Sequence, residues 1–582
     1  MGYDLDGAAM NVPLLPVANQ RPSPVRAADH LVRCLLRHGV DRVFGIPGGT
    51  ISPVFDALVA AEIELVSCQH ETMAVYAAAG YARATGRPAV VAVTSGPGVL
   101  NALTGLAAAD RDELPVLLLC GEADTRSFGR APLQDGSTNG LDIVTMARSL
   151  TRHAEQVMRP ERVAAAVDQA LSTIGRAPHG AALLSLPFDV TRAPVTSASI
   201  VGRREPAPAL PDPTLCAEIA AMLAEAERPA IMLGVGAKRA GVGPIVQRIA
   251  ERLRIPVLTD LEGKGCMPES HPLSLGVFGI GSRGRATAYL RTGVDLLVTV
   301  GCRLDDNTTH RYAECLRPEG GVLVQIDHHA ERLGRAYAAD RMLCADLVLT
   351  CEELERQLPA PRRPRELGPR LATTLEAAAN TTSRAPHDPR LVAPAVVAAL
   401  GPGSALCCDI GNHLLFAAQS LAVDDPDGFW ASAGLGGMGS GLGVSIGMQL
   451  AYGHRRRVAC IVGDGGLLMC GNELCTLARY RVPLVVVAFD DRRWGMVSDG
   501  FEQIYGHRPS QFDTPTVDLV EYGRSMGVRS HRIESLTEIE AHVHDHPHEP
   551  LLLVVPIDPR VQPTNERNEV LGDDTEDRAP LG

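Results

Sequence analysis

The first residues with recognisable chemistry are two aspartates that each follow an apolar run. Residues 461–462 lead into Asp464, which stands between two glycines, and residues 483–489 lead to Asp491. In a β-turn-helix-β unit these aspartates, 27 residues apart, would lie at the carboxyl ends of neighbouring parallel strands, where open α/β sheets bind ligands. Glycine N–H groups can approach an anion closely at such a turn. Two carboxylates beside it suit a hard cation that bridges to phosphate oxygens, most simply Mg²⁺.

The same stretch has a plainer interpretation. A helix of roughly a dozen residues is predicted after the turn at Asp464. The unit could then be an ordinary strand-turn-helix with two surface acids, because a Gly-Asp-Gly tripeptide alone is a weak signal.

Three further clusters contain residues that could do chemistry. Glu71 opens an Ala-rich helical pattern among small and apolar neighbours, although alone it also fits a surface glutamate that complements the helix dipole. Residues 94–101 form a Gly-Pro turn and could be no more than that, with a helix predicted to begin at the last of them. Residues 410–413 precede a loop, 432–442, with so many glycines that its backbone must pass close to a partner. His413 alone fits a hydrogen-bonded structural histidine.

Alternating strands and helices must position these clusters. Short apolar runs and helical patterns alternate along the chain, which predicts an α/β fold with doubly wound parallel sheets. Pro-rich linkers near 205–213 and 359–364 divide it into three domains of similar size. The first and third could be structural relatives, although their sequences do not show it. The boundaries are expected at 26–195, 206–358 and 386–562, with a disordered tail over 1–25 and an acidic tail over 563–582.

Composition excludes several classes of protein. A chain of 582 residues with net charge −13 lacks the basic surface that a nucleic-acid-binding protein needs. No apolar run has the length of a membrane-spanning helix, and the first residues lack the basic region of a signal peptide. The 14 cysteines include no C-x-x-C pair and mostly lie in apolar runs. This usage indicates buried thiols in a reducing cytoplasm rather than a disulfide framework.

Taken together, the clusters resemble the thiamine diphosphate enzymes, in particular the acetolactate synthase (acetohydroxyacid synthase) large-subunit group. The resemblance covers about residues 25–560, with its motifs in family order. The matching stretches are 43–49, 70–71, 94–101, 268–276, 301–306, 326–327, 434–442, 463–465 and 494–497. It implies that the first domain binds the pyrimidine ring of the cofactor and the third its diphosphate. The sites would lie between the chains of a homodimer or homotetramer.

The resemblance also implies roles for single residues. Glu71 would hydrogen-bond the pyrimidine N1′ and favour the imino tautomer that takes the thiazolium C2 proton, and Met438 would be an apolar wedge under the bent cofactor. The implied catalytic residues are Glu71, Met438, Gln134 and Gly49. The implied cofactor-binding residues are Pro47, Pro97, Asn101, Gly411, Asn412, His413, Gly436, Met438, Gly463, Asp464, Gly465, Gly466 and Met496. Asp464, Asp491 and the carbonyl of Arg493 would bind Mg²⁺.

This sequence departs from the family pattern at three places. Family members usually have two asparagines where this chain has Asp490 and Asp491, which keeps the oxygen ligands but adds a negative charge. Acetolactate synthases have an arginine for the substrate carboxylate where this chain has Asn307, and a tryptophan where it has Gly500. An amide does not replace a bidentate guanidinium at equal strength. Gln134 still matches a pocket glutamine, although it could be an exposed loop amide.

Three functions remain open at this point. The first is a thiamine diphosphate-dependent acyl transferase or lyase that decarboxylates a 2-oxo acid and joins the resulting enamine to a carbonyl acceptor. The second is a simple decarboxylase that releases an aldehyde, which the loss of the arginine and tryptophan favours. The third is a non-catalytic regulatory paralogue, against which Glu71 and the Mg²⁺ ligands argue. FAD is also an open question, because the Gly-rich turn at 233–238 could bind it or simply connect a strand to a helix.

Overall fold

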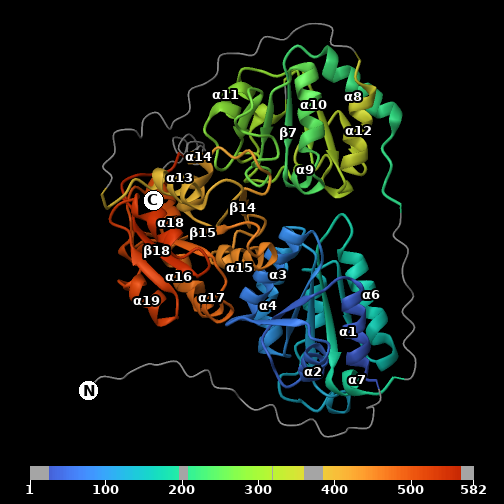
Figure 1. Ribbon diagram of the computed structural model, residues 1–582. Coiled ribbons are helices and arrows are strands. Elements are labelled where there is room, and N and C mark those ends of the chain that lie inside the picture. Colours follow the sequence, from blue (N-terminus) through green and yellow to red (C-terminus); the bar gives the residue numbers. More distant parts are fainter. Residues whose placement is uncertain (1–24, 196–206, 318, 360–383, 565–582) are drawn as a thin grey trace, which may run out of the picture.

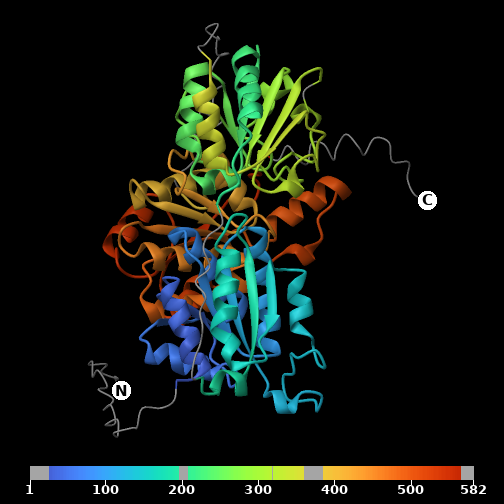
Figure 2. The same ribbon diagram turned by 90° about the vertical axis from the view of Figure 1, so that its right-hand side faces the viewer.

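Three six-stranded parallel sheets form the computed structural model, which describes residues 25–195, 207–317, 319–359 and 384–564. The expected tails at 1–25 and 563–582 lie almost wholly outside the described residues. The central domain lies at the top of Figures 1 and 2, the first at the bottom and the third between them. Within the described part of the chain, no helix has the length and apolar character needed to cross a membrane.

Each sheet is flanked by helices of its own segment (Figure 1). The first domain contains β1 Arg42–Gly45, β2 Glu64–Ser67, β3 Ala89–Val93, β4 Val116–Glu122, β5 His153–Gln156, β6 Ala181–Pro187, α1 Ala27–Arg37, α2 Ser52–Ala60, α3 Glu71–Thr85, α4 Pro97–Arg111, α5 Ile143–Arg148, α6 Val163–Ile174 and α7 Phe188–Arg192. The central domain contains β7 Pro229–Leu233, β8 Val257–Thr259, β9 Ser274–Val277, β10 Leu296–Val300, β11 Val322–Asp327, β12 Arg341–Cys344, α8 Pro213–Glu225, α9 Val235–Ala240, α10 Gly243–Leu253, α11 Arg285–Arg291 and α12 Leu347–Gln357. The third contains β13 Ala405–Cys408, β14 Phe429–Ala431, β15 Val458–Gly463, β16 Val485–Asp490, β17 Arg529–Arg532, β18 Leu551–Pro556, α13 Pro389–Leu400, α14 Asn412–Ser420, α15 Ser440–Tyr452, α16 Asp464–Cys470, α17 Leu474–Tyr480, α18 Gly495–Tyr505, α19 Leu519–Ser525 and α20 Glu538–Asp545.

The first and third sheets have the same topology. Their strand orders are β2-β1-β3-β4-β6-β5 and β14-β13-β15-β16-β18-β17, so the suspected structural relationship is confirmed. The order reverses between β1 and β3 in one sheet and between β13 and β15 in the other. Such switch points open a crevice at the carboxyl edge of a sheet. The central sheet differs, with the order β12-β11-β10-β7-β8-β9 and its switch point between β7 and β10.

Helices α3 and α15 join the first and third domains through a very close contact (Figure 1). A Cβ atom at Gly80 would lie 1.9 Å from the Val444 carbonyl oxygen, and one at Gly447 would lie 1.8 Å from the Ala77 carbonyl oxygen. Only glycine permits this approach. The two helices are almost wholly buried, and this contact fixes the start of α3 relative to the third sheet.

Two predicted helices differ in the structure. Helix α4 begins at Pro97 rather than Asn101, because proline at the first helical position needs no N–H partner. The helix predicted after Asp464 is instead two short helices, α16 and α17, joined by a 3₁₀ turn over Gly471–Glu473. A Cβ atom at Gly471 would lie 2.6 Å from the Tyr522 ring. The chain therefore turns tightly against α19, and Glu473 points toward the first domain.

Candidate active site

A cavity of about 270 Å³ lies at the carboxyl edge of the third sheet. It opens at the switch point between β13 and β15, as this topology predicts. Its lining includes all the third-domain residues that the sequence singled out for cofactor or metal binding. These are Gly411, Asn412, His413, Gly436, Met438, Gly463, Asp464, Gly465, Gly466, Asp491, Arg493 and Met496. Ile410, Phe489, Trp494, Gly495, Val497 and Ile557 complete the lining.

Asp464 and Asp491 line this cavity directly after the neighbouring strands β15 and β16. Asp464 is 4 % exposed and accepts hydrogen bonds from the Gly465 N–H (2.7 Å) and the Thr514 hydroxyl (3.0 Å). Burial and the nearby Asp491 carboxylate raise the pKa of Asp464 to about 6. Burial also raises the pKa of Asp491. Two neighbouring acids whose pKa values are both raised by burial form a site that a divalent cation would stabilise.

The Arg493 guanidinium orients one of these acids, Asp491. It is buried and donates to Asp491 (2.8 Å) and Asp499 (2.9 Å). The Asn412 side chain donates to the other oxygen of Asp499 at 2.7 Å. This network holds α14, α18 and the end of β16 in one arrangement, so the carboxylate of Asp491 is pre-oriented. Sequence reasoning missed Asp499 and Thr514, which no short motif connects with Asp464.

His413 has an unpartnered nitrogen at the cavity. Its ring is 6 % exposed, burial lowers its pKa to about 4, and its Nε2 has no hydrogen-bond partner in the described chain. A Cβ atom at Gly463 would lie 3.3 Å from the same ring. A neutral imidazole, glycine N–H groups and two carboxylates fit a Mg²⁺-bound diphosphate, because such a group needs hydrogen-bond donors and oxygen ligands.

A second buried acid, Asp409, holds the glycine-rich loop of the cavity. Its carboxylate is fully buried and accepts hydrogen bonds from the N–H groups of Gly439 (2.8 Å) and Gly441 (3.0 Å). Burial raises its pKa to about 6, although these N–H groups oppose the rise. Met438 is 39 % exposed at the tip of the same loop. Sequence reasoning missed Asp409, whose only signal was its position directly after an apolar strand.

Glu71 lies in a different environment, at the first position of α3. It is half-buried and accepts a hydrogen bond from the Asn101 side chain at 3.0 Å. The Thr72 hydroxyl donates to the Asn101 carbonyl, which ties the start of α3 to α4. Gln134 lies beside the β3–α4 turn. A Cβ atom at Gly96, in that turn, would be only 2.8 Å from the Gln134 Cβ. Gln134 is thus half-buried rather than a free loop amide.

The first-domain residues are not part of the cavity in the third domain. Glu71, Gln134, Gly49, Pro47, Pro97 and Asn101 do not line it. Pro47, Gly49, Pro97 and Asn101 are exposed on the surface of this single chain. The expected site therefore divides into two parts: a buried diphosphate-side part in the third domain and an open pyrimidine-side part in the first.

Glu473 connects these two parts within the chain. It is 1 % exposed, and one carboxylate oxygen accepts hydrogen bonds from the Gln69 N–H (2.8 Å) and the His70 N–H (3.0 Å). The other oxygen accepts from the Thr476 hydroxyl at 2.6 Å. Burial raises the pKa of Glu473. The residue immediately before Glu71 is thus held by the third domain, a contact that spans about 400 positions and has no local sequence signal.

Comparisons with known proteins agree with this architecture. The family model of the thiamine pyrophosphate (thiamine diphosphate) enzymes matches in three parts: its N-terminal TPP binding domain at residues 25–146, its central domain at 216–354 and its C-terminal TPP binding domain at 409–555. An acetolactate synthase large subunit from Parasynechococcus marenigrum is 33 % identical over 87 % of this chain and 83 % of its own. The large subunit of acetolactate synthase isozyme 2 from Escherichia coli is 29 % identical over 89 % of this chain and 92 % of its own.

A solved structure supports the fold independently. Benzoylformate decarboxylase from Polynucleobacter necessarius superposes with a TM-score of 0.81 at 22 % identity, covering 93 % of this chain and 100 % of its own. At that identity the likeness concerns the fold. The family matches and the large-subunit relatives together show that this chain belongs to the thiamine pyrophosphate enzymes, as an enzyme of the acetolactate synthase type.

Proposed function

We propose that the enzyme decarboxylates a 2-oxo acid and transfers the remaining acyl unit to a carbonyl acceptor. The observation that carries this proposal is the third-domain cavity, in which Asp464, Asp491 and the unpartnered His413 are arranged for a metal-bound diphosphate. Thiamine diphosphate, when bound there, supplies a nucleophilic carbon and an electron sink for the loss of CO₂. The large-subunit relatives named acetolactate synthase support the transfer step.

The two parts of the site would have different roles, metal and diphosphate binding in the third domain and proton transfer in the first. Asp464 and Asp491 would hold Mg²⁺ together with the Arg493 carbonyl, and Gly411, Asn412, His413 and Gly463–Gly466 would surround the diphosphate. Glu71 would hold and move a proton at the pyrimidine end. Asn101 donates to its Oε2, and Oε1, which has no hydrogen bond to any described residue, would serve that task. Met438 would offer an apolar support, while Pro47, Gly49, Pro97, Gln134, Gly436 and Met496 would line the reaction space.

We infer that each complete site combines parts of two copies of the chain. Glu71 is half-buried and its partner Asn101 is exposed in one copy, and neither lines the cavity that carries Asp464. The family to which the chain belongs makes a homodimer or homotetramer the natural assembly. A carboxylate that moves protons works best when water is excluded, and a second copy would provide that cover.

Mixing two inactive variants tests this assembly. At a limiting concentration of thiamine diphosphate and Mg²⁺, Glu71→Gln and Asp464→Asn should each be nearly inactive alone. After unfolding and refolding together, mixed dimers should contain one site with both changes and one intact site, which restores about a quarter of the wild-type activity if pairing is random. Recovery no greater than in either variant alone would place both parts of each site in one chain.

Product analysis tests the reaction itself. Purified enzyme with thiamine diphosphate and Mg²⁺ should be supplied with pyruvate and with a panel of other 2-oxo acids, while CO₂ and organic products are measured. Release of CO₂ with an acyloin product supports the proposal. Release of CO₂ with free aldehyde alone contradicts the transfer step, and no CO₂ from any 2-oxo acid contradicts the decarboxylation.

A simple decarboxylase is the second candidate, and two residues favour it. Asn307 stands where an acceptor carboxylate would meet an arginine in the acetolactate synthases, and an amide binds a carboxylate more weakly. Gly500 leaves open space in α18, with no atom within 4 Å of a Cβ placed there. If the enzyme does transfer the acyl unit, these residues favour an aldehyde or another acceptor without a carboxylate.

We propose that the central domain works without FAD. At its switch point the turn at Gly234 packs directly on Gly301. A Cβ atom at Gly234 would lie 2.3 Å from the Gly301 carbonyl oxygen. The buried carboxylates of Asp260 and Glu262 lie at the same edge. Burial and Glu262 raise the pKa of Asp260 to about 7. A carboxyl group at this edge is a poorer partner for a dinucleotide pyrophosphate than N–H donors would be, and the nearby guanidinium of Arg303 is already paired with Glu262. A visible absorption spectrum with flavin bands would contradict this proposal.

A further inference from the structure

The end of helix α1 presents two side chains that bind metal ions in many proteins, a thiol and an imidazole. Cys34 lies in the last turn of α1, and the backbone N–H of His38 donates to the Cys34 carbonyl oxygen at 3.2 Å. His38 therefore lies one helical turn beyond Cys34, and side chains at this spacing share one face of a helix. Helix α1 packs against α6 (Figure 1), so a residue of α6 can meet both side chains.

Asp168 of α6 brings a carboxylate to these two side chains. Its Oδ1 atom lies 2.9 Å from the Nε2 atom of His38. One ligand atom from each of Cys34, His38 and Asp168 lies within 4.8 Å of the other two. Atoms that bind one tetrahedral Zn²⁺ ion lie about 3.3–3.5 Å apart, as its bond lengths to nitrogen and sulfur require. Side-chain shifts on the order of 1 Å would therefore bring all three atoms to one ion.

The three ligand atoms lie where buried and exposed surroundings meet. The Cys34 side chain is fully buried, whereas the side chains of His38 and Asp168 are 25 % and 14 % exposed. An ion could therefore reach the thiol from solvent and keep a water molecule as a ligand. Burial and the Asp168 carboxylate raise the pKa of Cys34 to about 12, while Arg37 acts in the opposite direction. Arg37 is exposed, so water screens its charge, and a cation meets little repulsion.

We propose that Cys34, His38 and Asp168 bind a divalent ion of the Zn²⁺ type, with water as the fourth ligand. Sulfur, imidazole nitrogen and carboxylate oxygen are ligands that Zn²⁺ accepts in tetrahedral geometry, whereas Mg²⁺ prefers oxygen alone. The thiol forms the Zn–S bond and releases its proton to solvent, and the imidazole keeps its proton on Nδ1. The carboxyl end of α1 adds a favourable dipole. The ion ties α1 to α6 on the sheet face opposite α3.

A second group of potential ligands is less suited to a cation. Glu113, His328 and His329 also have ligand atoms within 4.8 Å of one another. Glu113, however, already forms ion pairs with Arg239 and Arg332. These guanidinium groups would repel an added ion. The group contains no sulfur, so a measurement that detects a metal–thiolate bond distinguishes it from the site at Cys34.

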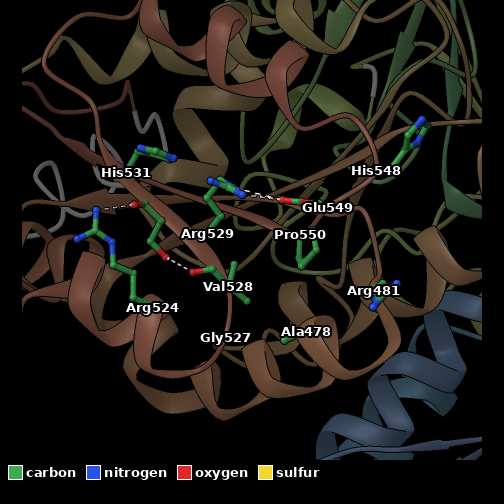
Figure 3. Close-up of a pocket in the computed structure, with 11 residues that line it drawn as sticks. Ala478, Arg481, Arg524, Gly527, Val528, Arg529, His531, His548, Glu549 and Pro550 are labelled. Atoms are coloured by element: carbon green, nitrogen blue, oxygen red, sulfur yellow. Dashed lines mark hydrogen bonds and ion pairs between the residues drawn. The ribbon is translucent and has the colours of Figure 1, made fainter. Parts of the chain in front are cut away.

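An open groove at the edge of the third domain supplies a control for capture by exposed histidines. Its lining includes two histidines, one glutamate and three arginines: His531, His548, Glu549, Arg481, Arg524 and Arg529. Figure 3 shows Arg529 between His531 and Glu549 in this view, with its ion pair to Glu549 dashed. The arginines disfavour a cation in the groove. Replacement of the exposed His548 should therefore leave specific zinc binding unchanged.

Calorimetric titration with zinc sulfate tests the site on the full chain with bound thiamine diphosphate, after removal of free cofactor, in excess Mg²⁺ and a thiol-free reductant. His38→Asn and Asp168→Asn should each weaken Zn²⁺ binding by at least about tenfold, because losing a ligand costs no less than losing its supporting hydrogen bond. Both positions are partly exposed, so these variants should fold. His548→Asn is the matched control and should bind as the wild type does. Zn²⁺ should raise the unfolding temperature of the wild type and the control more than that of the two ligand variants.

Absorption spectroscopy with cobalt chloride tests the thiol separately. Co²⁺ can replace Zn²⁺ in sites with nitrogen, oxygen and sulfur ligands. When a thiolate binds it, Co²⁺ absorbs in the near ultraviolet through charge transfer from sulfur. This absorption should appear with the wild type and His548→Asn, and it should be lost in Cys34→Ala.

Three outcomes would contradict the proposed site. Zinc binding that persists unchanged in His38→Asn and Asp168→Asn would place the ion elsewhere and overturn the proposal. Equal weakening in His548→Asn would do the same, since it would indicate unspecific capture by histidines. Absence of zinc binding to the wild type, or of the cobalt–thiolate absorption, would also refute it.

Discussion

The first and third domains are built on one plan but carry different chemistry. Their sheets share a strand order, and the turns after β1 and β3 occupy the same places in the plan as those after β13 and β15. In the third domain these turns surround a buried cavity with paired acids. In the first domain they are open, and Glu71, the carboxylate proposed to move a proton, begins α3. The shared topology therefore determines at which edge of the sheet a site can form, while single residues after the strands determine its chemistry.

Helices α3 and α15 occupy equivalent positions in the two domains. Each follows the second strand of its domain, and the two pack against each other through Gly80 and Gly447. The start of α3 presents a carboxylate, whereas the start of α15 follows a glycine loop fixed by Asp409. In the proposed function, equivalent helix starts would serve proton transfer in one domain and support of the cofactor in the other.

Glu71→Gln should produce the largest effect. Loss of a positioned acid–base group costs about 10²–10⁴-fold in turnover, while the diphosphate side in the third domain remains intact. We therefore expect kcat to fall by that amount with little change in the dissociation constant for thiamine diphosphate. Steady-state kinetics and calorimetry measure the two quantities separately. Glu62→Gln, an exposed first-domain glutamate, is the matched control, and unchanged kcat in Glu71→Gln would refute its role.

Asp464→Asn should instead lower the affinity for thiamine diphosphate and leave the chemical step intact. The amide is a weaker Mg²⁺ ligand, so we expect cofactor affinity to fall by about 10²-fold, the upper range for disturbed metal sites. Activity should recover at high concentrations of Mg²⁺ and thiamine diphosphate, because Glu71 is unaffected. Calorimetry with and without excess Mg²⁺ measures this. A variant that binds the cofactor normally but does not turn over would mean that Asp464 has a different role.

Most of the strand arrangement and of the site is predictable from the sequence. The residues that are not predictable depend on tertiary contacts. Apolar runs ending at Gly463 and Asp491 predict neighbouring strands, because strand ends and turn glycines are local features. Asp409, Asp499 and Glu473 were not predictable. Each has a partner on another element of the chain, at 30, 87 and 404 positions for Gly439, Asn412 and Gln69 respectively. The helix after Asp464 was wrongly predicted as continuous, since only the tertiary contact between Gly471 and Tyr522 explains the break. Gln134 also needed the structure to place it beside Gly96.

Asp409 predicts a pH dependence of stability that belongs to the third domain. Its carboxyl ionises near pH 4 in the unfolded chain but near 6 in the folded one, where burial raises its pKa. The folded state therefore binds more protons between these values, and the free energy of unfolding falls as pH rises through this window, by up to ~3 kcal/mol. Urea unfolding of the wild type and Asp409→Asn at pH 5 and 7 measures it.

The amide of Asp409→Asn does not titrate, so this variant should lack that component of the pH dependence. It should be less stable than the wild type at pH 5, because its side-chain NH₂ faces a glycine N–H. The difference between the two proteins should shrink toward pH 7. Parallel curves for the two proteins would mean that Asp409 ionises normally in the folded state.

Glu473→Gln should have the smallest effect, yet it tests the link between the two domains most directly. The amide oxygen can still accept from Gln69 and His70, but hydrogen bonds to a neutral acceptor are weaker than those to a carboxylate, by about 1 kcal/mol in total. Because these bonds hold the residue before Glu71, kcat should fall a few-fold while cofactor affinity stays unchanged. Glu473→Ala leaves two N–H groups unpaired and should lower kcat further. A loss of cofactor affinity with unchanged kcat would show that Glu473 serves the third domain rather than Glu71.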